Sequence, residues 1–451
     1  MGARTFIEYS QDQDFLLPPS LLDWLPADHL AHFISETVES FDLSQWEAAY
    51  ASEQGAGAPP FAPRMMLKVL LYGYAAGVFS SRKLAARCVE DIAFCFLAGQ
   101  LRPDFRSLLK FRKRHLARFK GLFVQIVQLA RESGLVSLGR IAIDGSKIKA
   151  NASKHKAMSY QHMCEQEQKL AKEIEEILAR ADATDDAEDQ RFGDYDGYSL
   201  PEALSHREKR LETIQAAKAR LEARARERAE HEEERREAEA KAREERCEKP
   251  KEYRKPPGPL PKAKEQENFT DPESRIMKDG ATKGFIQAYN AQIAVDADHH
   301  IIVATELNNQ ASDNHRLLPV IEAVRENTGA YPKQTLADAG YKSETNFEAL
   351  DTHPTDAYVA CGREAYDPRV PCPKGPIPKA ATYTDRMKRK LQTKKGRETY
   401  RTRKHIVEPV FGWIKQVMGY RQASLRGEKN VRAEWNLVCG ALNLRRMATL
   451  T

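Results

Sequence analysis

The sequence predicts an α/β protein in which a mixed β-sheet follows an all-helical N-terminal region and is interrupted by a helical hairpin. Apolar residues recur at three- and four-residue spacing between positions 63 and 135, which is typical of helices. Short apolar runs typical of strands occur near position 141 and again between 285 and 360. A highly charged segment separates the two sets of strands. We therefore expect units at 1–135, 136–158, 159–268 and 269–451.

Composition restricts the possible protein classes. The chain has 451 residues, a formal net charge of +6 and 41% hydrophobic residues. No apolar run reaches the ~20 residues that cross a bilayer, and the first residues lack an apolar signal core. The seven cysteines form no C-x-x-C pair, which fits a reducing compartment and disfavours structural zinc. We expect a soluble cytoplasmic protein without a membrane partner.

The N-terminal region is predicted to contain several short helices. Pro63 fits the first turn of one, Ser80 or Ser81 can cap a second, and Asp104 can cap a third that runs through Phe119. The second and third helices carry clustered cations, namely Arg82, Lys110, Arg112, Lys113 and Arg114. Such clusters neutralise DNA phosphates, although a solvated basic face would have the same composition.

A strand is predicted where the helical period ends. Ile141, Ala142 and Ile143 form an apolar run that ends at Asp144. Asp144-Gly145-Ser146 is expected to turn the chain into a hairpin with 147–151. An ionisable residue at the end of a buried strand is costly unless it has a partner or a function.

The charged segment predicts two antiparallel helices. Leu170, Ile174 and Leu178 lie on one apolar stripe and Leu211 and Ile214 on another, with a glycine-bearing turn at 185–197 between them. An Arg/Glu/Ala run at 224–248 is expected to be a solvated helical arm supported by ion pairs. The proline-rich stretch 256–261 predicts a stiff linker.

The second set of strands completes a mixed core. Runs at 285–295 and 301–305 predict a hairpin, and a helix capped by Asp313 or Asn314 follows. Two short strands are expected at 335–337, ending at Asp338, and at 357–360. The tail from 397 to 447 is predicted to be helical and basic.

Three acidic residues are candidates for a metal site: Asp144 and Asp338, each ending a strand, and Glu408 in a basic helix. Divalent ions of the Mg²⁺ type prefer carboxylate ligands that converge at one edge of a sheet. A turn-forming role for each aspartate and a surface position for the glutamate are the alternatives. Arg401, Lys404 and Lys415 fall on the same helical face as Glu408, which suits a metal ligand beside a polyanion.

Four segments resemble bacterial insertion-sequence transposases of the DDE class. They are Ile141 to Ser146, Tyr289 to Gln292, Leu336 to Tyr341 and Arg403 to Lys415, and the closing Leu442 to Arg446 also matches. In that family a Tyr, Arg, Glu, Lys signature surrounds the glutamate. Lys415 fits the last position of this signature. Strict spacing places Arg401 and Lys404 at the Tyr and Arg positions, whereas Tyr400 and Arg403 stand one place earlier.

The resemblance implies an RNase H-like catalytic core with Asp144, Asp338 and Glu408 as the catalytic triad. It implies that this triad binds two Mg²⁺ ions, for which Mn²⁺ can substitute, and that the N-terminal helices hold transposon ends. It further implies DNA contacts at Lys147, Arg401, Arg403, Lys404 and Lys415. The implied partner is double-stranded DNA, both at the transposon ends and at the target. The protein is expected to bind it as a homodimer and to associate with the nucleoid when bound.

The sequence thus predicts a transposase that cuts and joins strands at terminal inverted repeats. A metal-dependent nuclease on the same core, which cuts without joining, is one alternative. A domesticated DNA-binding protein that has lost catalysis is another, although all three carboxylates remain. The G-x-x-x-x-G-K-[ST] spacing is absent, so no nucleotide cofactor is expected.

Overall fold

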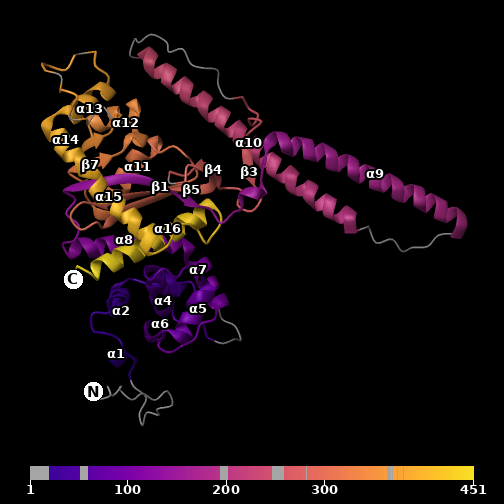
Figure 1. The fold of residues 1–451 in the computed structure, drawn as a ribbon, viewed down its shortest axis with the longest axis horizontal. Coiled ribbons are helices and arrows are strands. Elements are labelled where there is room, and N and C mark those ends of the chain that lie inside the picture. The colour runs from indigo at the N-terminus through magenta and orange to yellow at the C-terminus, as the bar shows by residue number, and fades with distance from the viewer. Residues whose placement is uncertain are drawn as a thin grey trace, which may run out of the picture.

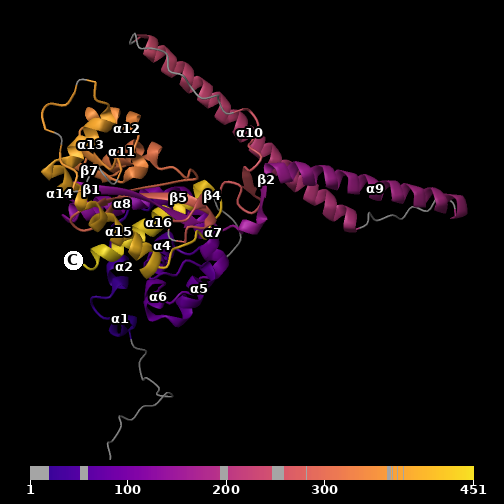
Figure 2. The same cartoon turned by 45° about the horizontal axis from the view of Figure 1, so that its top comes forward.

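The computed structural model describes residues 20–50, 59–192, 202–245, 258–280, 282–362, 367, 369–372, 374–378 and 380–450. A body of sheet and helices carries two long helices that project away from it (Figures 1 and 2). No helix among these residues is long and apolar enough to cross a membrane.

The N-terminal region is helical, as predicted. Its helices are α1 (Leu21–Trp24), α2 (Leu30–Ser40), α3 (Ser44–Ala48), α4 (Pro63–Ala75), α5 (Ser81–Glu90), α6 (Ile92–Leu97), α7 (Phe105–His115) and α8 (Phe119–Glu132). Pro63 begins α4, Ser80 precedes α5, and the Asp104 carboxylate caps α7 by accepting the Ser107 N–H at 2.6 Å. The predicted third helix is not continuous, because a 3₁₀ turn at Leu116–Arg118 separates α7 from α8.

A six-stranded mixed sheet forms the centre of the body. Its strands are β1 (Arg140–Lys149), β4 (Arg275–Lys278), β5 (Phe285–Asp296), β6 (Ile302–Asn308), β7 (Gln334–Ala337) and β8 (Asp356–Val359). The order is β4-β5-β1-β7-β8, and β6 also pairs with β5. β5 is antiparallel to β1 and β6, whereas β7 is parallel to both β1 and β8. This confirms the predicted α/β class and is the RNase H-like arrangement.

The predicted turn at Asp144-Gly145-Ser146 is wrong. β1 continues through these residues and pairs with β5 from Ile141↔Asp296 to Lys149↔Ala288. The physical reason is the length of β5, which provides backbone partners along the whole of β1 and so outweighs the local preference of Asp-Gly-Ser for a turn.

Helices cover the sheet and join it to the N-terminal region. They are α11 (Leu317–Thr328), α12 (Glu344–Asp351), α13 (Tyr383–Gln392), α14 (Lys394–Arg401), α15 (Arg403–Gly412) with a π-helical turn at Trp413–Val417, and α16 (Glu428–Met447). α16 packs against α8, α4 and β6, and Trp435 on it is fully buried. One hydrophobic core therefore runs from the N-terminal helices through the sheet.

The charged segment forms the projecting pair, α9 (Tyr160–Phe192) and α10 (Glu202–Glu245). They pack through a separate small core that includes Met163, Leu170 and Ile214. α10 then continues alone past the other side of their base, as Figures 1 and 2 show. The predicted turn is helical as far as Phe192, and its remainder, like Pro256 and Pro257 of the linker, lies outside the described residues.

A two-stranded ribbon closes the base of this projecting pair. β2 (Ala157–Ser159) pairs antiparallel with β3 (Gln266–Asn268), so the two ends of the charged segment lie side by side. Glu267 of β3 is buried and forms ion pairs with Arg220 and Arg224 of α10.

Candidate active site

Two of the predicted catalytic carboxylates meet at one edge of the sheet. β1 and β7 are parallel neighbours, and their register pairs Ile143 with Ala337. The next residue on each strand is Asp144 and Asp338, respectively. Because these two residues are level in the parallel register, the sheet places Asp338, just after the end of β7, beside Asp144, which lies midway along β1.

Each aspartate accepts a backbone hydrogen bond from a nearby glycine. Gly145 N–H donates to Asp144 Oδ1 at 2.8 Å, and Gly340 N–H donates to Asp338 Oδ1 at 2.9 Å. Burial and the nearby Asp338 carboxylate nevertheless raise the pKa of Asp144 to about 6. Burial also raises the pKa of Asp338. The site thus holds two carboxylates that resist ionising together.

Arg403 forms an ion pair with one of the two aspartates, Asp144. Its Nη1 lies 3.1 Å from Asp144 Oδ2, and only 9% of its side chain is exposed. Tyr400, one turn earlier, is also buried. Arg401 and Lys404 are exposed, and neither forms a hydrogen bond or ion pair with the two aspartates. Of the two possible alignments of the family signature, the structure orients Arg403 toward the site.

The structure does not bring Glu408 to the two aspartates. Glu408 is exposed on α15, and its side chain has no hydrogen bond or ion pair to the residues that the structure describes. Within the same residues, no group of three or more His, Cys, Asp or Glu side chains could hold a metal ion. Glu408 lies between two residues that do contact the site region: Arg403, and Lys415, whose Nζ donates to Ser146 Oγ at 2.5 Å.

The sequence analysis missed the role of Asp313. This residue was expected to cap a helix, but its side chain makes no capping bond. Its Oδ1 instead accepts hydrogen bonds from Asn290 Nδ2 at 2.5 Å and Gln292 Nε2 at 2.6 Å, and lies 3.5 Å from Lys147 Nζ. The signal for this network was the pair of amides Asn290 and Gln292, two residues apart and therefore on the same face of a mainly apolar strand.

Asp313 also lies against the two glycines that donate to the aspartates. A Cβ added to Gly145 would stand 3.0 Å from Asp313 Oδ1 and 2.4 Å from Gln292 Nε2. A Cβ on Gly340 would stand 3.1 Å from Asp313 Oδ2 and 3.0 Å from Asp338 Oδ1. The absence of a side chain at both positions therefore provides the space for this polar network.

The predicted basic surface of the N-terminal region is present with one correction. Arg82 on α5 and Lys110, Lys113 and Arg114 on α7 are exposed. Arg112 is not available to DNA, because its side chain is 4% exposed and its Nη2 forms an ion pair with Glu434 of α16 at 3.4 Å. It occupies the apolar stripe of α7, one turn after Leu108.

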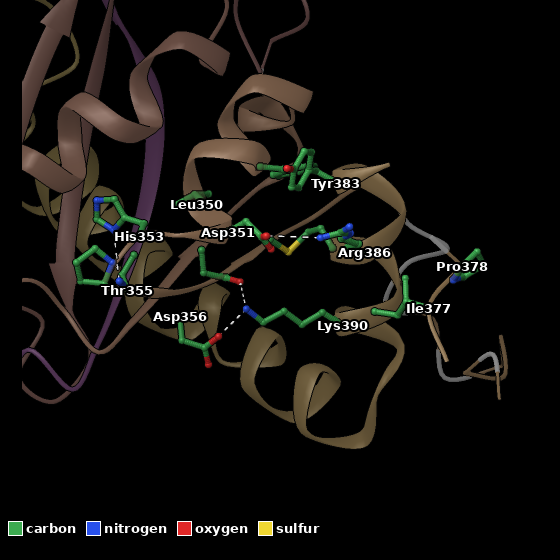
Figure 3. A pocket seen from close by; sticks show the side chains of 14 residues that line it. Leu350, Asp351, His353, Thr355, Asp356, Ile377, Pro378, Tyr383, Arg386 and Lys390 are labelled. Carbon is green, nitrogen blue, oxygen red and sulfur yellow. Dashed lines mark hydrogen bonds and ion pairs between the residues drawn. The ribbon is translucent and has the colours of Figure 1, made fainter. Parts of the chain in front are cut away.

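A large cavity of about 770 Å³ lies elsewhere, between α12, β8 and α13. Figure 3 shows that its charged side chains are paired, Lys390 with Asp356 and Arg386 with Asp351. None of the predicted catalytic residues lines this cavity. Its volume therefore does not identify the active site.

Two segments of the chain match known protein families. Residues 19–114 match a family described as Transposase domain (DUF772), and residues 257–444 match the Transposase DDE domain. No curated protein and no solved structure matches the chain significantly. DDE transposases act on DNA and generally use divalent metal ions. With the two transposase domains in this order and the mixed α/β core, the chain belongs to the DDE transposases of insertion sequences.

Proposed function

We propose that this transposase cleaves and joins DNA strands at the terminal inverted repeats of its own element by two-metal-ion phosphoryl transfer. Asp144, Asp338 and Glu408 are the proposed catalytic residues. The observation that carries the proposal is the convergence of Asp144 on β1 and Asp338 at the end of the parallel strand β7, beside the buried Arg403.

The donor set fits divalent ions. Both aspartates offer hard carboxylate oxygens of the kind that Mg²⁺ and Mn²⁺ prefer. Burial and the neighbouring Asp338 carboxylate raise the pKa of Asp144, and a cation bound between the two carboxylates would favour their ionised forms. Bound ions would supply a water of lowered pKa and would stabilise the charge that develops on the oxygens of the reacting phosphate.

Glu408 is the proposed third ligand because of its place on α15. It is exposed, and it stands between Arg403 and Lys415, which both reach β1 near the aspartates. A modest movement of α15 on binding DNA would direct Glu408 toward the pair. In this proposal, the exposed position of Glu408 is the one it has in the protein without DNA.

The cations around the pair bind and orient the strand. Arg403 places a guanidinium beside Asp144, and Lys415 places an ammonium beside Ser146 on the same strand. If Asp144 served as a metal ligand, the Arg403 guanidinium would be free to bind a phosphate oxygen. Because two DNA ends must react together, we propose that a homodimer forms on DNA.

Plasmid cleavage tests this function. The substrate carries the DNA that flanks the gene, and wild type is compared with Asp338→Asn in Mg²⁺, in Mn²⁺ and in EDTA. We expect cleavage at the element boundary that requires metal and falls more than about 100-fold in Asp338→Asn, because the variant lacks a ligand of the reacting centre.

The matched control is Asp351→Asn, which removes the same charge at the cavity of Figure 3. It should cut like wild type. Equal cleavage by wild type and Asp338→Asn would contradict the assignment of the site. Cleavage without strand joining would instead favour the nuclease alternative.

A further inference from the structure

Two segments of the chain are basic and contain no acidic residue. Residues 145–164 hold four lysines and residues 409–427 hold one lysine and two arginines, and neither segment contains aspartate or glutamate. The cations are Lys147, Lys149, Lys154 and Lys156 in the first segment, and Lys415, Arg421 and Arg426 in the second. In a chain with 65 acidic residues, their absence from both segments suggests a polyanionic partner.

The structure joins these segments side by side. Lys149 N–H donates to the Arg421 carbonyl at 3.1 Å, and Ala423 N–H donates to the Lys149 carbonyl at 2.8 Å. Arg426 Nε donates to the Asn151 carbonyl at 3.0 Å. The loop that precedes α16 is therefore fixed to the end of β1, and the cations of both segments share one surface.

Five of these cations form what we call the cationic surface: Lys149, Lys154, Lys156, Arg421 and Arg426. All five are exposed. The three lysine side chains have no hydrogen bond or ion pair to any residue that the structure describes. Glu273 and Glu428 mark the boundary of the surface, since they lie beyond Gly427. Cations without acidic partners are available to bind phosphates.

The cationic surface adjoins the N-terminal helices and includes Lys149, which follows Asp144 along β1. Arg112 of α7 donates to Ser424 Oγ at 2.8 Å, which places the loop directly against α7. At roughly 3.3 Å per residue, Lys149 lies about 17 Å along β1 from Asp144.

We propose that the cationic surface binds the phosphate backbone of the duplex whose strand reacts at Asp144 and Asp338. Duplex rather than single-stranded DNA is the partner, because single-strand binding uses aromatic side chains on which bases stack. The one tyrosine of the loop, Tyr420, is buried. This inference rests on the proposed function for the position of the reacting strand.

The test removes the three lysines that have no protein partner. Lys149→Gln, Lys154→Gln and Lys156→Gln are combined, and binding of a duplex element end is measured across a range of salt concentrations. Each phosphate that the protein no longer neutralises lowers the slope of log K against log salt by about 0.9, so we expect a drop of roughly two to three. Phosphate ethylation of the duplex end should weaken binding by wild type at the phosphates that the surface contacts, and the variant should lose this sensitivity.

The control removes the same amount of charge from the projecting helices. Lys169→Gln, Lys209→Gln and Arg226→Gln change exposed residues of α9 and α10, and the salt slope should stay at the wild-type value. An unchanged slope in the first variant, with both proteins folded by circular dichroism, would overturn the inference. Loss of single-strand binding alone would overturn its assignment to duplex DNA.

Failure of this inference can be told apart from failure of the proposed function. If wild type cuts and the lysine variant binds and cuts equally well, the surface does not bind DNA and the function stands. If wild type binds duplex with a steep salt slope that the variant loses, but Asp338→Asn does not change cleavage, the surface stands and the catalytic site is wrong.

Discussion

Two buried arginine–carboxylate pairs in this protein differ in what surrounds them. Arg112 and Glu434 join α7 to α16, and both side chains are at most 4% exposed. Glu434 also accepts the N–H groups of Ser424 and Leu425 at 3.0 and 3.1 Å and the Tyr74 hydroxyl at 3.2 Å. The carboxylate is thus fully satisfied by protein donors, and the pair serves the fold.

The pair at the catalytic edge is incomplete by comparison. Asp144 accepts one backbone N–H and one Arg403 bond, is 21% exposed, and has a raised pKa. Similar residue types therefore form a structural contact in one place and the proposed reactive site in the other. The number of donors around the carboxylate makes the difference.

The largest expected effect comes from breaking the structural pair. Glu434→Ala leaves the Arg112 charge buried without a carboxylate and should lower the free energy of unfolding by about 3–5 kcal/mol. Chemical denaturation measures this change. Glu428→Ala, on the partly exposed first turn of the same helix, is the control and should cost far less. Equal decreases in the free energy of unfolding of the two variants would mean that the buried pair contributes no more to stability than Glu428 does.

The stability of the protein should depend on pH through Asp144, the carboxylate of the proposed catalytic pair. The folded-state pKa of Asp144 is about 6, above its ordinary 3.8, so the folded protein holds this proton more tightly than the unfolded chain. The wild type therefore loses stability as the pH rises from about 4 to 6. Asp144→Asn cannot ionise, and its advantage over wild type should grow over that interval to at most about 3 kcal/mol and stay level above it.

Thermal unfolding of both proteins at pH 4 and pH 8 without divalent metal measures this difference. Added Mg²⁺ should stabilise wild type at pH 8 more than the variant. A variant that is equally stabilised or destabilised at both pH values would contradict the raised pKa.

The smallest expected effect concerns the exposed face of α7. Replacing Lys110, Lys113 and Arg114 by Gln should lower the salt slope of DNA binding by about 0.9 for each phosphate that these side chains neutralise. The residue between them, Arg112, should contribute nothing to this slope because it is paired with Glu434. Filter binding of a folded Arg112→Lys variant checks that point, and a reduced slope there would show that α7 rearranges on DNA.

The sequence was sufficient for the elements whose pattern is local. The helices that begin at Pro63 and after Asp104, the hairpin of β5 and β6, and the strand before Asp338 all formed where apolar spacing and caps predicted them. Asp144 and Asp338 were proposed as site residues because an ionisable group next to a buried apolar run is costly without a partner or a function, and the folded sheet brings the two together.

The sequence was insufficient where the outcome depends on distant partners. β1 runs straight through Asp144-Gly145-Ser146 because β5, far along the chain, pairs with it. Asp313 joined the site through Asn290 and Gln292, which only the folded sheet brings near. The burial of Arg112 was in principle readable, since it follows Leu108 by four residues on the apolar stripe of α7.

The ribbon of β2 and β3 has a consequence for how this gene could have changed over time. The two ends of the charged segment meet in this ribbon. The 106 positions from 160 to 265 therefore begin and end at neighbouring points of the body. Insertion or loss of material there leaves the path of the remaining chain unaltered, in contrast to a change within the sheet. Transposases of related insertion sequences can thus gain, lengthen or lose these helices while keeping the same proposed catalytic site.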